Sequence, residues 1–164
     1  MGDGRLKIAD KPHDIYDIVV LDSFSSDNIP VHLITREAVQ IYLDTLKEDG
    51  ILVFHISNKF LNLEPVLARI AEELDLEGLS KIVFGDQWED TSLKYNTVHA
   101  FLMTRDPDKS ALFRNEYGWR ESHASEDTPL WTDQYSNILT VLGKKKLSPD
   151  QAAAMPEAPE TNDQ

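Results

Sequence analysis

The chain has 164 residues, of which 41% are hydrophobic and 27% are charged, a composition that fits one globular domain with a real core. Its formal net charge of −13 argues against nucleic acid as a partner, because phosphate backbones need a basic surface, and it is compatible with a cationic substrate. The absence of cysteine excludes disulfides and thiolate metal sites. It also fits a reducing compartment, and we expect a cytoplasmic location.

The first predicted strand covers residues 18–21, a short apolar run that is rich in β-branched residues and bounded by polar ones. Such a run is typical of a strand buried on both faces of a parallel sheet. A helix is expected next, because Thr35 can cap its N-terminus and apolar residues recur at helical spacing from Val39 to Leu46. Gly50 is expected to end this helical region.

The apolar segments continue to alternate between strand and helix patterns. The sequence predicts strands over residues 51–56, 81–84 and 98–103, and a second helix that has Pro65 in its first turn. Strand, helix, strand, helix, strand is an α/β pattern with right-handed crossovers. Residues 106–129 are polar and irregular, so loops and a short helix over one end of the sheet are expected there. We assign residues 1–142 to the domain and residues 143–164 to a disordered tail.

Two carboxylates follow the first predicted strand. In open α/β sheets ligands bind beyond the carboxyl ends of the strands, and Asp22 stands at such an end. A carboxylate in that position can hold an ammonium group or accept its proton, with Asp27 at the rim of the same loop. The structural alternative is that Asp22 caps the following turn and Asp27 is merely solvated.

Five segments resemble, in their order and spacing, the polyamine aminopropyltransferases, the spermidine synthases. They are GDGR at 2–5, YDIVVLD at 16–22, IPVHLITREAVQIY at 29–42, DGILVFHISN at 49–58 and WTDQYSNIL at 131–139. The resemblance extends over residues 2–142. It is closer to the spermidine-synthase-like domains that some bacterial membrane proteins carry, which would make this chain the cytoplasmic part of such a protein.

The resemblance implies a Rossmann-like sheet of the S-adenosylmethionine-dependent methyltransferase type, with helices on both faces. It implies transfer of an aminopropyl group from decarboxylated S-adenosylmethionine, a co-substrate, to a polyamine acceptor, with no tightly bound cofactor and no metal. By resemblance Gly2, Asp3 and Gly4 bind the nucleoside, and Asp3 contacts the adenine amino group. Asp22 would deprotonate or orient the attacking amine, and Asp27 would help to bind it.

In the family the first strands and a glycine-rich turn precede the segment that resembles GDGR. This sequence therefore resembles the C-terminal part of the domain, and catalysis is expected only once the N-terminal half is supplied. The strand at 18–21 would then have an unpaired apolar edge, which favours self-association or a partner that supplies the missing strands.

Two other functions fit the same sequence features. One is methyl transfer from S-adenosylmethionine to a small molecule, and the other is a non-catalytic module that binds a nucleoside or a polyamine, or serves in interactions. Further candidates for the amine side are acids and aromatics: Glu37, Asp86, Trp88, Glu89 and Asp133. For Trp88 and Trp131 we favour packing. For His55 and His99 we favour a structural, hydrogen-bonded role.

Overall fold

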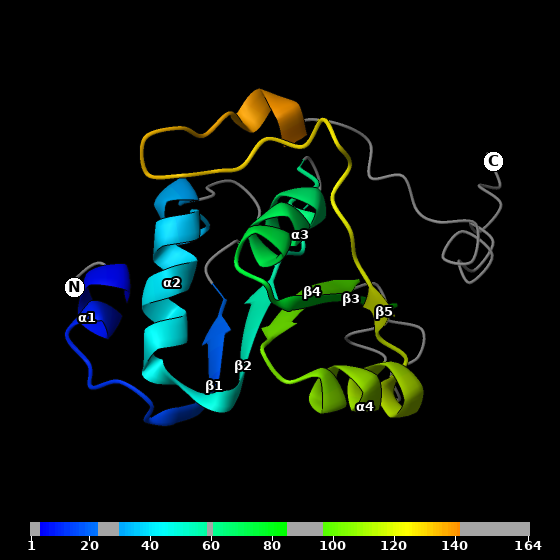
Figure 1. Ribbon diagram of the computed structural model, residues 1–164. Helices are drawn as coiled ribbons and strands as arrows, with labels where there is room; N and C mark the ends of the chain where they lie inside the picture. The colour runs from blue at the N-terminus through cyan, green and yellow to red at the C-terminus, as the bar shows by residue number, and fades with distance from the viewer. Residues whose placement is uncertain (1–3, 23–29, 59–60, 85–96, 142–164) are drawn as a thin grey trace, which may run out of the picture.

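The computed structural model describes residues 4–22, 30–58, 61–84 and 97–141 (Figure 1). Its five-stranded sheet has the order β1-β2-β4-β3-β5, with β1 and β2 parallel and the other three pairings antiparallel. The strands are β1 (Tyr16–Leu21), β2 (Leu46–His55), β3 (Glu77–Val83), β4 (Val98–Thr104) and β5 (Arg120–Glu121). The four predicted strands are therefore present, although β1, β2 and β3 begin earlier than predicted. The expected tail, residues 143–164, lies outside the described residues.

Helices cover both faces of this sheet, as expected for the α/β class. The α-helices are α1 (Gly4–Ala9), α2 (Arg36–Thr45), α3 (Glu64–Glu73) and α4 (Pro107–Tyr117), and two short 3-10 helices are η1 (Val31–Leu33) and η3 (Ile138–Val141). Figure 1 shows α3 above β3 and β4 and α4 below them. None of the helices in the described ranges has the length and apolar character that crossing a bilayer requires.

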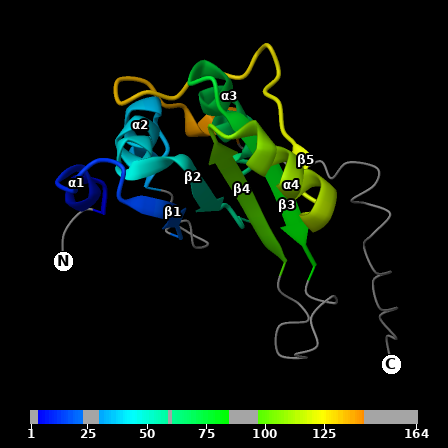
Figure 2. The same ribbon diagram turned by 60° about the horizontal axis from the view of Figure 1, so that its bottom comes forward.

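Local capping explains where two of these helices begin. Thr35 accepts a hydrogen bond from the Ala38 N–H at 3.2 Å, which confirms the predicted cap of α2. The Asp106 side chain accepts hydrogen bonds from the backbone N–H groups of Asp108 and Lys109. Pro107 follows the cap directly, in the first turn of α4. Gly118 ends α4 with φ at +66°, a left-handed conformation that favours glycine. The helix expected within residues 106–129 is therefore present, with 11 residues, but it lies along β3 and β4 and not over one end of the sheet (Figure 2).

Two apolar clusters hold the layers together. The larger one lies between the sheet and helices α2 and α3, where Leu52, Phe54 and Phe101 are fully buried. Trp131 is also fully buried in this cluster, so the predicted packing role of this tryptophan is confirmed. The smaller cluster, which includes Leu79, lies under α4 on the opposite face. Figure 2 shows α4 lying along β3 and β4 and not reaching β1.

Strand β1 forms one edge of the sheet, and the prediction that it is buried on both faces is wrong. Val19 and Leu21 pack toward the larger cluster. Ile18 and Val20 point to the other face and are 55% and 62% exposed, because α4 covers only the far side of that face. β1 therefore presents both an apolar face and a free edge within the described part of the chain.

A polar cluster of four side chains joins α3 to the antiparallel half of the sheet. Glu64 Oε2 lies 3.1 Å from His99 Nε2, and Ser122 Oγ donates a hydrogen bond of 2.8 Å to Glu64 Oε1. Burial opposes ionisation of Glu64, but the bonds from His99 and Ser122 and the charge of Arg120 more than offset it and lower the pKa to about 2. Glu64 is therefore ionised in the folded protein at any pH near neutrality.

The depressed pKa of Glu64 predicts a stability that depends on pH. A shift from 4.5 to about 2 is equivalent to roughly 3 kcal/mol of unfolding free energy, present above pH 4.5 and lost as the pH falls toward 2. We expect Glu64→Gln to lower the unfolding free energy at pH 7 by up to this amount, and the gap to wild type to close as the pH falls from 5 to 2. Urea unfolding at a series of pH values measures it. Glu48→Gln, on an exposed side chain of β2, is the control, and an equal effect of both variants would contradict the prediction.

Candidate functional site

The parallel pairing of β1 and β2 brings two polar side chains together at the carboxyl ends of these two strands. Leu21 lies opposite Phe54, so the residues that follow them, Asp22 and His55, are neighbours. His55 Nδ1 lies 2.6 Å from Asp22 Oδ1. The Asp22 side chain is 73% exposed and that of His55 is 39% exposed, so the pair is open to solvent within the described part of the chain.

The second nitrogen of His55 bonds to a serine two residues further along. His55 Nε2 lies 2.7 Å from Ser57 Oγ, and Ser57 Oγ accepts a hydrogen bond of 2.8 Å from the His99 backbone N–H. Aspartate, histidine and serine stand here in the order seen in serine hydrolases. The Ser57 oxygen also bonds to the backbone of β4 and thereby ties the segment after β2 to that strand.

The predicted structural role of the two strand histidines is thus confirmed in its main point, since both are hydrogen-bonded. His99 is buried and bonds to Ser80 Oγ at 2.9 Å and to Glu64. His55 differs, because its partner is the acid predicted to act on the amine. The sequence did not indicate this contact, which depends on the register between two strands separated by a helix.

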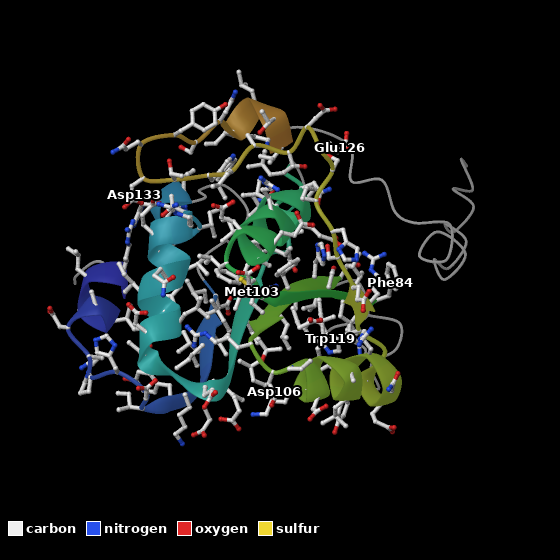
Figure 3. All side chains as sticks on the ribbon, in the orientation of Figure 1. Phe84, Met103, Asp106, Trp119, Glu126 and Asp133 are labelled. Carbon is white, nitrogen blue, oxygen red and sulfur yellow. The ribbon has the colours of Figure 1, made fainter. Side chains whose placement is uncertain are left out.

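A second polar network ties the two ends of the described chain together. Arg5 forms a bidentate pair with Asp133, with N–O distances of 2.7 and 2.6 Å. Thr35 Oγ1 also donates to Asp133, at 2.7 Å, and Glu37 accepts a bond from the Asp133 backbone N–H at 2.9 Å. Figure 3 shows Asp133 at the upper end of α2, where the segment after β5 passes above α3 and α2. The network therefore fixes α1, and the segment after β5 that carries Asp133, to the N-terminus of α2.

The charges in this network stabilise one another. The hydrogen bond to Asp133 raises the pKa of Arg5, and the same guanidinium, helped by Thr35, lowers the pKa of Asp133. Burial opposes ionisation of Glu37, but the hydrogen bonds from its own backbone N–H and from that of Asp133 offset burial and lower the pKa. Glu37 and Asp133 were predicted as candidates for the amine side, and here both are engaged in structural contacts.

Two pockets lie between α1 and β1, beside the edge strand. The smaller one, of 170 Å³, is lined by Gly4 and Arg5 of α1, by Leu21 at the end of β1 and by Tyr42 of α2, among others. The larger one, of 310 Å³, lies further back along β1 and includes Lys7 and Ile18 in its lining. Asp22, the residue after Leu21, is not part of the lining of either pocket.

Of the residues predicted to bind the donor or the amine, the structure describes Gly4 and Asp22. Gly4 lines both pockets, and Asp22 follows a residue that lines the smaller one. Gly2, Asp3 and Asp27 lie outside the described residues, as do Asp86, Trp88 and Glu89. Within the described ranges, no group of three or more histidines, aspartates and glutamates is arranged to hold a metal ion.

Comparison with known proteins links this architecture to spermidine synthases. No protein-family model and no curated protein matches the sequence. A solved structure described as a probable spermidine synthase, from Corynebacterium glutamicum ATCC 13032, matches with a TM-score of 0.50 and 14% identity over 84% of this chain and 54% of its own. A spermidine synthase structure from Thermotoga maritima matches with a TM-score of 0.45 and 14% identity. A spermidine synthase structure in complex with the transition state analogue AdoDATO matches with a TM-score of 0.44 and 13% identity. Each match covers 87% of this chain, and 45% and 44% of the neighbour.

The first of these matches shows the fold. The chain has an α/β fold like that of this probable spermidine synthase. The chain spans about half the length of the solved structures that it matches. The fold-class prediction is confirmed, and at this level of identity the likeness concerns the fold alone.

Removing the Asp133 carboxylate should loosen α1. Asp133→Ala leaves Arg5 and Thr35 without this acceptor, and since the carboxylate is 42% exposed we expect a loss of only about 1 kcal/mol of unfolding free energy. Amide hydrogen exchange in α1 should accelerate more than exchange in α3. Asp127→Ala, on an exposed side chain of the same segment, is the matched control. Unchanged protection of α1 in Asp133→Ala would contradict the role assigned to the network.

Proposed function

We propose that this chain carries the amine-handling part of an aminopropyltransferase of the spermidine synthase type. The observation that carries the proposal is the position of Asp22, at the carboxyl end of an edge strand, with one oxygen bonded to His55 and the side chain largely exposed. The spermidine-synthase-like fold and the motifs of the sequence support the same function.

The chemistry needs a neutral amine placed in line with an activated carbon. In the proposed reaction an N–H proton of the polyamine passes to an oxygen of Asp22. The freed lone pair attacks the carbon of the aminopropyl group that is bonded to the sulfonium of decarboxylated S-adenosylmethionine. The C–S bond breaks with its electron pair moving to sulfur, which leaves methylthioadenosine and the lengthened polyamine, and Asp22 then returns the proton to solvent.

The nucleoside side of the site is proposed at the start of the chain. Gly2, Asp3 and Gly4 would hold the adenosine part of the donor, with Asp3 on the adenine amino group, and Asp27 would help to bind the amine. The pocket of 170 Å³ supports a nucleoside site at this end of the chain, because Gly4 and Arg5 of α1 line it together with Leu21 of β1. An acidic chain also favours a cationic acceptor, since a negative cleft concentrates amines.

The partner proposed for β1 is a strand that completes the sheet. An N-terminal half of the domain, or a second copy of this chain, would pair with the free edge and cover Ile18 and Val20. Location at the cytoplasmic side of a bacterial membrane protein is part of the same proposal and rests on the sequence resemblance.

Asp22→Asn tests the amine site directly. Asparagine keeps the shape of the side chain but loses the charge that holds an ammonium group, so putrescine affinity should fall by at least about tenfold. Isothermal titration of the chain with putrescine measures the affinity, and thermal melting should show little change in stability. Asp17→Asn, on an exposed carboxylate of β1, is the matched control.

Two results would contradict this assignment. Equal putrescine affinity in Asp22→Asn and wild type would remove Asp22 from the amine site. A large drop in melting temperature with no specific loss of binding would identify Asp22 as a structural residue. Methylthioadenosine binding that perturbs the amides around Gly4 would support the nucleoside side independently.

The free edge of β1 predicts concentration-dependent association. Because each copy carries a charge of −13, raising the salt concentration should strengthen the association by screening repulsion. Val20→Glu should weaken it, whereas Leu112→Glu, at an exposed position on α4, should not. Sedimentation velocity over a range of protein concentrations measures the effect. A monomer at all concentrations and salt levels would leave only a separate N-terminal half as the proposed partner.

A further inference from the structure

The residue that controls Asp22 comes from the neighbouring strand. We infer that His55 is a positioning residue, which holds the Asp22 carboxylate in one orientation through a hydrogen-bond chain that begins on the backbone of β4. The inference rests on the proposed function, because it specifies how the acid of that site is held. His55 itself is not required to touch the substrate.

The protonation of the chain follows from its donors and acceptors. An ionised carboxylate can only accept, so a neutral His55 that is bonded to Asp22 carries its proton on Nδ1. His55 Nε2 then accepts a hydrogen bond, which the Ser57 hydroxyl donates. Ser57 Oγ keeps a lone pair for the backbone N–H of His99. Each of the three bonds has one donor and one acceptor, so a single neutral tautomer satisfies the whole chain.

The hydrogen-bond chain from Asp22 through His55 to Ser57 becomes more buried toward its start on β4. Ser57 is bonded to the backbone N–H of His99 in β4, and the buried side chain of His99 belongs to the polar cluster with Glu64. Asp22, at the other end, is the most exposed member. An aspartate this exposed would normally rotate among several rotamers, and a bond to a fixed imidazole restricts that freedom.

The bond also distinguishes the two carboxylate oxygens of Asp22. Oδ1 accepts the His55 Nδ1–H, and among the described residues nothing bonds to Oδ2. With Oδ1 fixed, Oδ2 points in one direction and is the oxygen that an incoming amine would meet. The role of His55 is therefore to present Oδ2 and to supply no charge of its own while neutral.

Two isosteric substitutions separate this role from general packing. In His55→Asn the amide nitrogen occupies the place of Nδ1 and can still donate to Asp22, whereas in His55→Gln it occupies the place of Nε2 and reaches Ser57 instead. We expect His55→Asn to keep putrescine affinity within about twofold of wild type, and His55→Gln and His55→Leu to lose about tenfold. Thermal melting of all three variants shows which of them remain folded.

A second readout does not depend on amine binding. Long-range ¹⁵N–¹H correlation spectra should show His55 as the Nδ1–H tautomer in the wild-type chain. Three-bond couplings should show one χ1 rotamer for Asp22 in wild type and in His55→Asn, and averaged rotamers in His55→Leu. An Nε2–H tautomer, or the same Asp22 rotamer distribution in wild type and His55→Leu, would overturn the inference.

The two readouts also separate this inference from the proposed function. If wild type does not bind putrescine but the tautomer and rotamer results are as expected, the amine function fails and the positioning of Asp22 by His55 stands. If putrescine binds equally well to wild type and to a folded His55→Leu, the amine site stands and the positioning role is refuted.

Discussion

Parallel pairing between β1 and β2 is the constraint on which the candidate site depends. Parallel strands end at the same edge of a sheet, and the register that sets Leu21 against Phe54 places the next residues, Asp22 and His55, side by side. A shift of β1 by one residue would turn the side chain of Asp22 to the other face and separate it from His55. The apolar contacts of Leu21 and Phe54 with the larger core enforce this register, so packing energy fixes the geometry of the polar pair.

Polar networks on either side of α2 and α3 complete the frame around that pair. The Arg5–Asp133 network holds α1 against the N-terminus of α2 and thus shapes the pocket lined by Gly4. The Glu64 cluster anchors β4, and through Ser57 it supports His55. The site is therefore attached to two rigid networks, although its most exposed residue, Asp22, follows an edge strand.

Much of this architecture could be predicted from the sequence, because local patterns determine it. The runs at 18–21 and 98–103, the cap at Thr35 and the α/β alternation all depend on neighbouring residues. The exposure of one face of β1 could not be predicted in this way, since Ile18 and Val20 are as apolar as the residues of a strand in a sheet interior. They are exposed because α4 does not reach β1. Helix α4 was underestimated, although Asp106, Pro107 and Gly118 carried the signals for its start and end.

The candidate site was predicted only where it lies within one segment of the chain. Asp22 was proposed because it ends a strand, and Gly4 because it belongs to a short motif that resembles one in spermidine synthases. His55 and Arg5 gain their roles from partners 33 and 128 residues away, and those contacts arise from register and crossing geometry. The folded sheet brings these segments together, and no local sequence pattern indicates such contacts.

The most direct test of the account is the carboxyl carbon of Asp22, observed by ¹³C NMR in the full chain during titration with putrescine. The account predicts a saturable shift of this resonance that 1,4-butanediol, a neutral molecule of similar length, does not produce. A resonance that ignores putrescine, or that responds equally to the diol, would contradict the claim that Asp22 handles a cationic amine.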